Sequence, residues 1–111
     1  MLTARSRLGR AGEQLAAEHL RSLGYEITAR NFRTRSGEID LVAVRDGGVL
    51  LIEVKTRAGT AHGLPIEAID ARKRRAMAAA ALEWRRATAW RGRLRVAAVT
   101  ITLEVIADAL D

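Results

Sequence analysis

The sequence has no cysteine, one proline and few aromatic residues, and each shortage excludes a class of protein. Without cysteine there is no disulfide framework, no thiolate zinc site and no cysteine nucleophile. The single proline, Pro65, leaves no stiff linker, and an aromatic content of 4% argues against a stacking platform for single-stranded nucleic acid. Any chemistry must therefore use side chains other than thiols.

Long hydrophobic runs are missing as well. The longest uncharged apolar run covers residues 76–82, far short of the ~20 residues that cross a bilayer. Residues 1–12 contain three arginines but no apolar stretch behind them, so they do not resemble a secretory signal. We therefore expect a cytoplasmic protein.

The charge is unbalanced towards the positive. The 111 residues contain 19 Lys and Arg, 17 of them Arg, against 13 Asp and Glu, which gives a net charge of +6 and a pI near 11.2. A chain of this length predicts one domain over residues 1–111. A basic domain attracts polyanions, and nucleic acid is the expected partner. The alternative is a basic composition with no functional meaning.

Hydrophobic periodicity predicts an α/β domain with a mixed sheet flanked by helices. We expect a helix over 6–23 that ends before Gly24, and a second helix over 66–86 with Pro65 in its first turn. Strands are predicted over 25–29, 38–44 and 49–56, with one or two more over 94–106. The predicted order is α-β-β-β-α-β, with one or two strands at the end.

The second and third strands should form a hairpin around Asp46-Gly47-Gly48, a tight-turn sequence. A loop of residues 46–47 would place Asp40 opposite Glu53, whereas a loop of residues 47–48 would place it opposite Lys55. Since side chains alternate along a strand, either register predicts that the three charges share one face of the sheet.

Two adjacent carboxylates repel each other unless a cation or a proton lies between them. Oxygen ligands suit a hard ion such as Mg²⁺ or Mn²⁺, and a nearby lysine could orient a water or stabilise charge on a phosphate. The purely structural alternative is a buried salt bridge that holds the hairpin in register. That alternative explains one pair but leaves the second carboxylate without a partner.

The segment Gly37-Glu38-Ile39-Asp40, followed by Glu53-Val54-Lys55, resembles the signature of the PD-(D/E)XK nuclease superfamily, which includes restriction enzymes and archaeal Holliday-junction resolvases. The sequence is still more similar to the YraN-like uncharacterised protein family. That resemblance covers about residues 8–109 and also rests on Gly12-Glu13, Gly24-Tyr25, Asn31-Phe32-Arg33, Thr56-Arg57, Gly63 with Pro65, and Glu67-Ala68-Ile69 with Lys73.

The resemblance implies a restriction-endonuclease-like fold and a role for each matched residue. Asp40 and Glu53 would bind the metal together with the carbonyl of Val54, Lys55 would be the catalytic lysine, and Glu13 would assist from the first helix. Phosphate contacts are expected from four basic residues: Lys73, Arg57, Arg33 and Arg72.

The favoured function is that of an endonuclease that uses Mg²⁺ or Mn²⁺ to hydrolyse DNA, including branched DNA such as Holliday junctions. A homodimer agrees with the resemblance to resolvases, although no feature of the sequence demonstrates one. The main alternative is a non-catalytic nucleic-acid-binding module of the same fold, and a weaker one is an adaptor for a processing protein.

Overall fold

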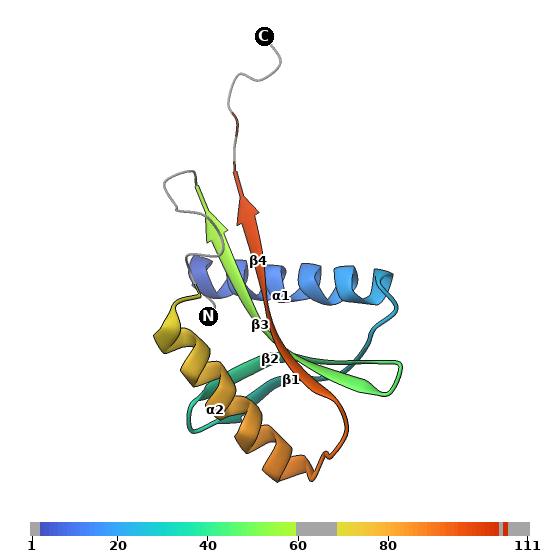
Figure 1. The fold of residues 1–111 in the computed structure, drawn as a ribbon. Helices are drawn as coiled ribbons and strands as arrows, with labels where there is room; N and C mark the ends of the chain where they lie inside the picture. Colours follow the sequence, from blue (N-terminus) through green and yellow to red (C-terminus); the bar gives the residue numbers. More distant parts are fainter. Residues whose placement is uncertain (1–2, 60–68, 105, 107–111) are drawn as a thin grey trace.

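The computed structural model describes residues 3–59, 69–104 and 106, which form two helices and four strands (Figure 1). The elements in chain order are α1 (Ala4–Ser22), β1 (Glu26–Thr34), β2 (Gly37–Arg45), β3 (Gly48–Ala58), α2 (Ala71–Thr88) and β4 (Leu94–Leu103). This order confirms the predicted α-β-β-β-α-β arrangement, with one strand after α2 in the part of the chain that the structure describes. Neither described helix combines the length and the hydropathy that a bilayer crossing requires.

The strands form one mixed sheet in the order β1-β2-β3-β4. The pairs β1/β2 and β2/β3 are antiparallel, whereas β4 runs parallel to β3 because α2 carries the chain back between them. β2 and β3 are therefore central, as expected for strands that are apolar on both faces.

The two helices cover opposite faces of this sheet, as Figure 1 shows. On one face, Ala16, Ala17 and Leu20 of α1 pack against three buried strand residues: Leu41, Ala43 and Ile52. On the other face, Ala80, Ala81 and Trp84 of α2 pack against Ile39, Val42, Val49 and Leu51. Small residues on both helices bring their backbones close to the sheet, so the position of each helix is tightly determined.

The turn between β2 and β3 selects the first of the two predicted registers. Asp46 and Gly47 form the loop, with φ angles of 51° and 75°, and Arg45 pairs with Gly48. Two consecutive positive φ angles are typical of a type I′ turn, which matches the twist of the flanking strands.

Two element boundaries differ from the prediction by more than three residues. β1 continues to Thr34 because pairing with β2 outweighs the polarity of its second half, which is tolerable in an edge strand. α2 begins at Ala71, not at residue 66, because the side chain of Asp70 caps it by accepting a hydrogen bond from the Lys73 amide. The expected contributions of Gly63, Pro65 and Glu67 lie outside the described residues.

The centre of the sheet contains a fork. β2 and β3 are paired only as far as Leu41 and Ile52. Before this point β2 pairs with β1 alone, from Gly37 onwards, and beyond it β3 pairs with β4 alone, up to Ala58. In Figure 1 the ends of β3 and β4 accordingly run together away from β1 and β2.

Candidate metal centre

Where β2 and β3 separate, the backbone amide of Val54 on β3 has no partner on the β2 backbone, and the side chain of Asp40 accepts its hydrogen bond. The Oδ2 atom of Asp40 accepts this hydrogen bond of 2.6 Å from the amide of Val54. Asp40 is only 9% exposed and is the one buried charged residue in the described part of the chain. The side chain therefore bridges the two diverging strands just where their backbone ladder ends.

Three carboxylates gather at this point. Oxygen atoms of Glu13, Glu38 and Asp40 all lie within 4.8 Å of one another. Glu13 comes from α1, while Glu38 and Asp40 come from β2. Opposite ligands of a six-coordinate Mg²⁺ are about 4 Å apart, so the three groups fit a divalent cation with small side-chain movements.

Asn31 of β1 ties two of these carboxylates together. Its Nδ2 donates to Glu38 Oε1 at 3.0 Å and lies 3.4 Å from both carboxylate oxygens of Glu13. Asn31 has a φ of 53°, a left-handed conformation that asparagine tolerates better than most residues. The amide fixes the carboxylates by hydrogen bonding, but as a neutral group it does not cancel their charge.

Burial and repulsion among the clustered carboxylates contribute to a raised pKa of Asp40. Burial raises the pKa of this carboxyl, the hydrogen bond from Val54 lowers it, and the charges of Glu13, Glu38 and Glu53 raise it again, to about 6 from the ordinary 3.8. A divalent cation would remove the repulsion among these groups. The donor set thus has the chemistry of a hard-metal site.

The predicted convergence of Asp40, Glu53 and Lys55 on one face stays a prediction, because Glu53 borders the group of Glu13, Glu38 and Asp40 without belonging to it. The side chain of Glu53 pairs with Lys73 of α2, on the opposite side of the sheet from Glu13, and Lys55 is exposed on β3. Glu53 remains close enough to raise the pKa of Asp40, and it lines the same small cavity as Glu38. Val54 contributes its amide, bound to Asp40.

Side-chain alternation is interrupted beside Asp40. Ile39 and Val42 face α2, whereas Leu41 faces α1, so two successive residues, Asp40 and Leu41, both point towards α1. The paired strand repeats this irregularity, because Arg30 and Asn31 both bond to residues of α1. Strict period-two alternation therefore fails at this position.

Two residues of the site were not assigned a role from the sequence: Glu38 and Asn31. Glu38 could have been found, because it stands two residues before Asp40 and residues at this spacing share a strand face. Asn31 carries no such signal, since its role depends on a left-handed backbone and on contacts from two other elements.

The four expected phosphate-binding residues differ in exposure and in their contacts. Arg33 is highly exposed on β1, with its Nε 3.8 Å from Glu38 Oε2. Arg57 is half-buried on β3, and Arg72 is exposed in the first turn of α2. Lys73 is engaged with Glu53. Of these four cations, Arg33 and Lys73 have described contacts with carboxylates of the fork.

Residues 12–101 match the sequence profile of the uncharacterised protein family UPF0102, the YraN-like family. The chain is 43% identical over 108 residues to a UPF0102 protein of Herpetosiphon aurantiacus, a match that covers 93% of this chain and 87% of the relative. It is 52% identical over 83 residues to a UPF0102 protein of Acidothermus cellulolyticus, covering 74% of this chain and 62% of the relative. A third relative, the UPF0102 protein STH1475 of Symbiobacterium thermophilum, is 60% identical over 73 residues, covering 65% of this chain and 61% of the relative. The matched segment contains all the carboxylates of the fork, and the chain belongs to the UPF0102 family.

Proposed function

We propose that this protein is a metal-dependent endonuclease that hydrolyses phosphodiester bonds of DNA, with branched DNA among its substrates. The observation that carries this proposal is the fork, where Glu13, Glu38 and Asp40 gather beside Glu53 in a chain of net charge +6. A protein that merely bound a polyanion would gain nothing from carboxylates directed at it. The resemblance to the PD-(D/E)XK superfamily supports the same function.

In this proposal Glu13, Glu38 and Asp40 supply the metal's oxygen ligands, and Glu53 lies at their edge. When bound, Mg²⁺ or Mn²⁺ neutralises the carboxylates and polarises the scissile phosphate. Lys55, exposed two residues beyond Glu53 on β3, orients the attacking water and stabilises charge on the phosphate. The water oxygen bonds to phosphorus as the bond to the leaving oxygen breaks, and the water proton passes to solvent.

The second candidate is a nucleic-acid-binding module without catalysis, favoured by the basic charge alone. A cleavage assay separates the two functions. Duplex, flap and four-way-junction DNAs are incubated with the protein in Mg²⁺, Mn²⁺ or EDTA. We expect cleavage that needs the metal and is strongest on one branched form. Binding without metal-dependent cleavage on any of these substrates would leave the binding module as the function.

DNA binding itself should fall steeply with salt. Each phosphate neutralised by a cation such as Arg33, Arg57 or Arg72 should contribute about −0.9 to the slope of log affinity against log salt concentration. Titration of labelled DNA between 50 and 200 mM salt, roughly the range over which such contacts are screened, measures this slope. A flat response would instead favour an adaptor that binds another protein.

A further inference from the structure

Lys73 forms an ion pair that links α2 to the fork. Its Nζ contacts Oε1 of Glu53, and the two side chains are 41% and 20% exposed. The other ion pairs among the described residues, Arg33 with Glu38 and Arg45 with Asp46, have more exposed carboxylates. Partial burial shields a charge pair from salt, so Lys73 neutralises Glu53 more effectively than a surface cation would.

The backbone of Lys73 is anchored independently of this ion pair. Its amide donates a hydrogen bond of 2.8 Å to Oδ1 of Asp70, the N-cap of α2. One turn later, Met77 packs beside Glu53 at the same small cavity. The ammonium can therefore leave Glu53 by rotation of its own side chain, while the helix stays in place.

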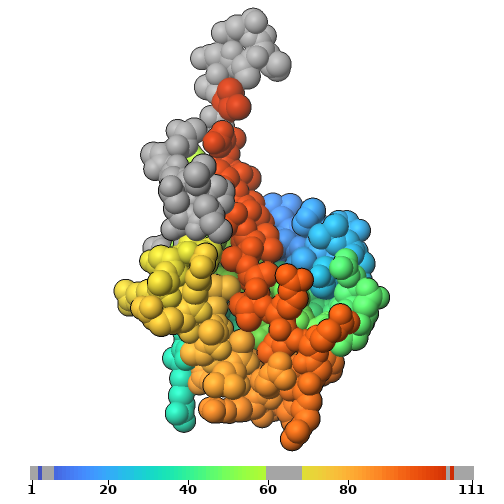
Figure 2. All heavy atoms as spheres, viewed as in Figure 1, coloured from blue at the N-terminus to red at the C-terminus, as the bar shows by residue number. Residues whose placement is uncertain are grey.

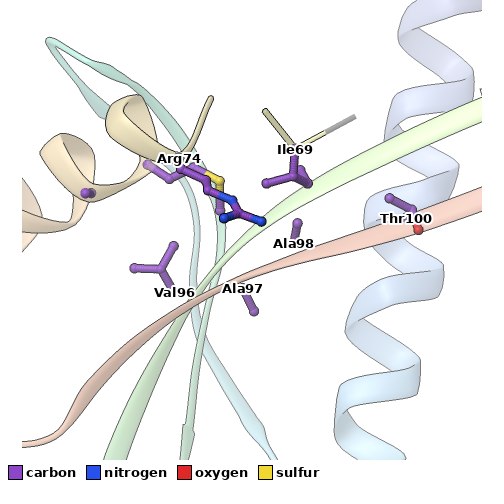
Figure 3. Close-up of a pocket in the computed structure, with 8 residues that line it drawn as sticks. Ile69, Arg74, Val96, Ala97, Ala98 and Thr100 are labelled. Atoms are coloured by element: carbon purple, nitrogen blue, oxygen red, sulfur yellow. The ribbon is translucent and has the colours of Figure 1, made fainter. Parts of the chain in front are cut away.

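The neighbouring cations take other directions. Arg74 lines a groove of about 550 Å³ between α2 and β4, together with Val96 and Thr100 (Figure 3). This groove lies where α2 and β4 adjoin on the face seen in Figure 2. Arg72 and Arg75 are exposed. Of residues 72–75, Lys73 is the one with a described contact to a carboxylate of the fork.

We propose that Lys73 is an exchangeable counter-ion: it neutralises Glu53 in the metal-free protein, leaves Glu53 when a divalent cation binds at the fork, and then becomes available to a phosphate of the nucleic acid. The physical basis is competition for charge. A fixed ammonium on Glu53 repels an incoming divalent ion and occupies the carboxylate oxygen that borders the site. This inference rests on the proposed metal site, and Lys73 acts in it as a positioning residue.

Amine labelling tests the exchange directly, because the chain contains only two lysines, Lys55 and Lys73. The full-length protein is treated briefly with an acetylating reagent in EDTA or in Mg²⁺, and each lysine is quantified by mass spectrometry. A paired ammonium reacts slowly, so Mg²⁺ should accelerate the labelling of Lys73 by about threefold or more. Labelling of the already exposed Lys55 should change much less.

Metal affinity provides the second readout, measured with Mn²⁺ by electron paramagnetic resonance. Lys73→Gln should bind Mn²⁺ about three- to tenfold more tightly than the wild type, because the competing charge is gone. Lys73→Arg, which keeps the charge, should stay near the wild-type affinity. The control Arg75→Gln removes an exposed cation of the same helix and should also have little effect.

Each outcome has a distinct meaning. If the wild type binds Mn²⁺ but neither Lys73 labelling nor the affinity of Lys73→Gln changes, the counter-ion exchange is refuted and the metal site stands. If the wild type binds no Mn²⁺, the proposed metal site fails and the exchange fails with it. Weaker Mn²⁺ binding by Lys73→Gln, with the helix content intact by circular dichroism, would show that Lys73 supports the site and does not compete with the metal.

Discussion

Asp40→Asn is expected to be more stable than the wild type without a divalent cation and less stable than the wild type with one. In EDTA at pH 7.5 the variant should be the more stable protein, because one of the crowded carboxylates has become neutral. The asparagine oxygen can still accept the hydrogen bond that Val54 donates. With Mn²⁺ the wild type should become the more stable, since metal binding stabilises by about 2.7 kcal/mol at a hundred times Kd and the variant loses this gain.

The pH dependence of the EDTA measurement follows from the raised pKa. The pKa of Asp40 is about 6 in the folded protein and 3.8 ordinarily. As pH rises from 4 to 6, the unfolded chain releases this proton first, so the folded state of the wild type loses stability over this window. The advantage of Asp40→Asn should therefore be near zero below pH 4 and grow to about 1–2 kcal/mol above pH 7.

Thermal or urea unfolding in EDTA at pH 4, 5.5 and 7.5 measures this difference, and the cleavage assay with Mg²⁺ completes the test. Asp40→Asn should abolish cleavage while DNA binding without metal is retained or tightened. Asp46→Asn, the same substitution in the turn of the same hairpin, is the control, because Asp46 is exposed and outside the cluster. Unfolding of Asp40→Asn at neutral pH would mean that Asp40 holds the hairpin together and has no catalytic role.

Most of the fold could be predicted because its signals are local. The apolar faces of α1 and α2 follow from helical periodicity. The Asp46-Gly47 dipeptide between two apolar strands predicts the type I′ turn that the structure contains. That turn fixes the register of β2 against β3 as far as Leu41 and Ile52. The parallel pairing of β4 with β3 depends on tertiary packing, and hydrophobic periodicity alone does not predict it.

The candidate site could be predicted only in part, because it lies where regular geometry ends. Asp40 and Glu13 were identified and are brought together, whereas Glu53, also identified, borders the cluster and pairs with Lys73. Regular strand geometry also fails at Asn31, whose backbone is left-handed. The ion pair between Lys73 and Glu53 joins residues from different elements, and no sequence spacing indicates such a contact.

Gly12→Ala is expected to damage both the fold and the site, although alanine is the better helix former. Gly12 is buried in α1, and a Cβ atom there would lie 1.8 Å from Oγ1 of Thr56 and 3.0 Å from its Cβ. Glycine in a helix costs about 1 kcal/mol relative to alanine. Its presence at this position is explained by the close approach of α1 to β3.

The added methyl group must push α1 away from β3, and Glu13 is the next residue of that helix. We expect Gly12→Ala to lower the free energy of unfolding by about 1–3 kcal/mol, the usual cost of overpacking. Since Glu13 then moves away from Asp40, Mn²⁺ affinity should fall by roughly tenfold or more, the effect expected when a metal ligand or its support is displaced. Urea unfolding and Mn²⁺ titration measure the two effects separately.

Gly9→Ala provides a control of opposite sign. A Cβ at Gly9, one turn earlier in α1, would meet nothing within 4 Å, so this substitution should stabilise the protein by about 0.5–1 kcal/mol.

A second variant tests the contact between Gly12 and Thr56 itself. Thr56→Ala removes Oγ1, which is buried without a hydrogen-bond partner among the described residues, so the single change should be nearly neutral. In the Gly12→Ala background it should restore much of the lost stability and Mn²⁺ affinity, giving a coupling energy of about 1 kcal/mol or more in a double-mutant cycle. Additive effects of the two substitutions would show that contact with Thr56 does not set the position of α1, and that Glu13 is held at the fork by other contacts, such as those with Asn31.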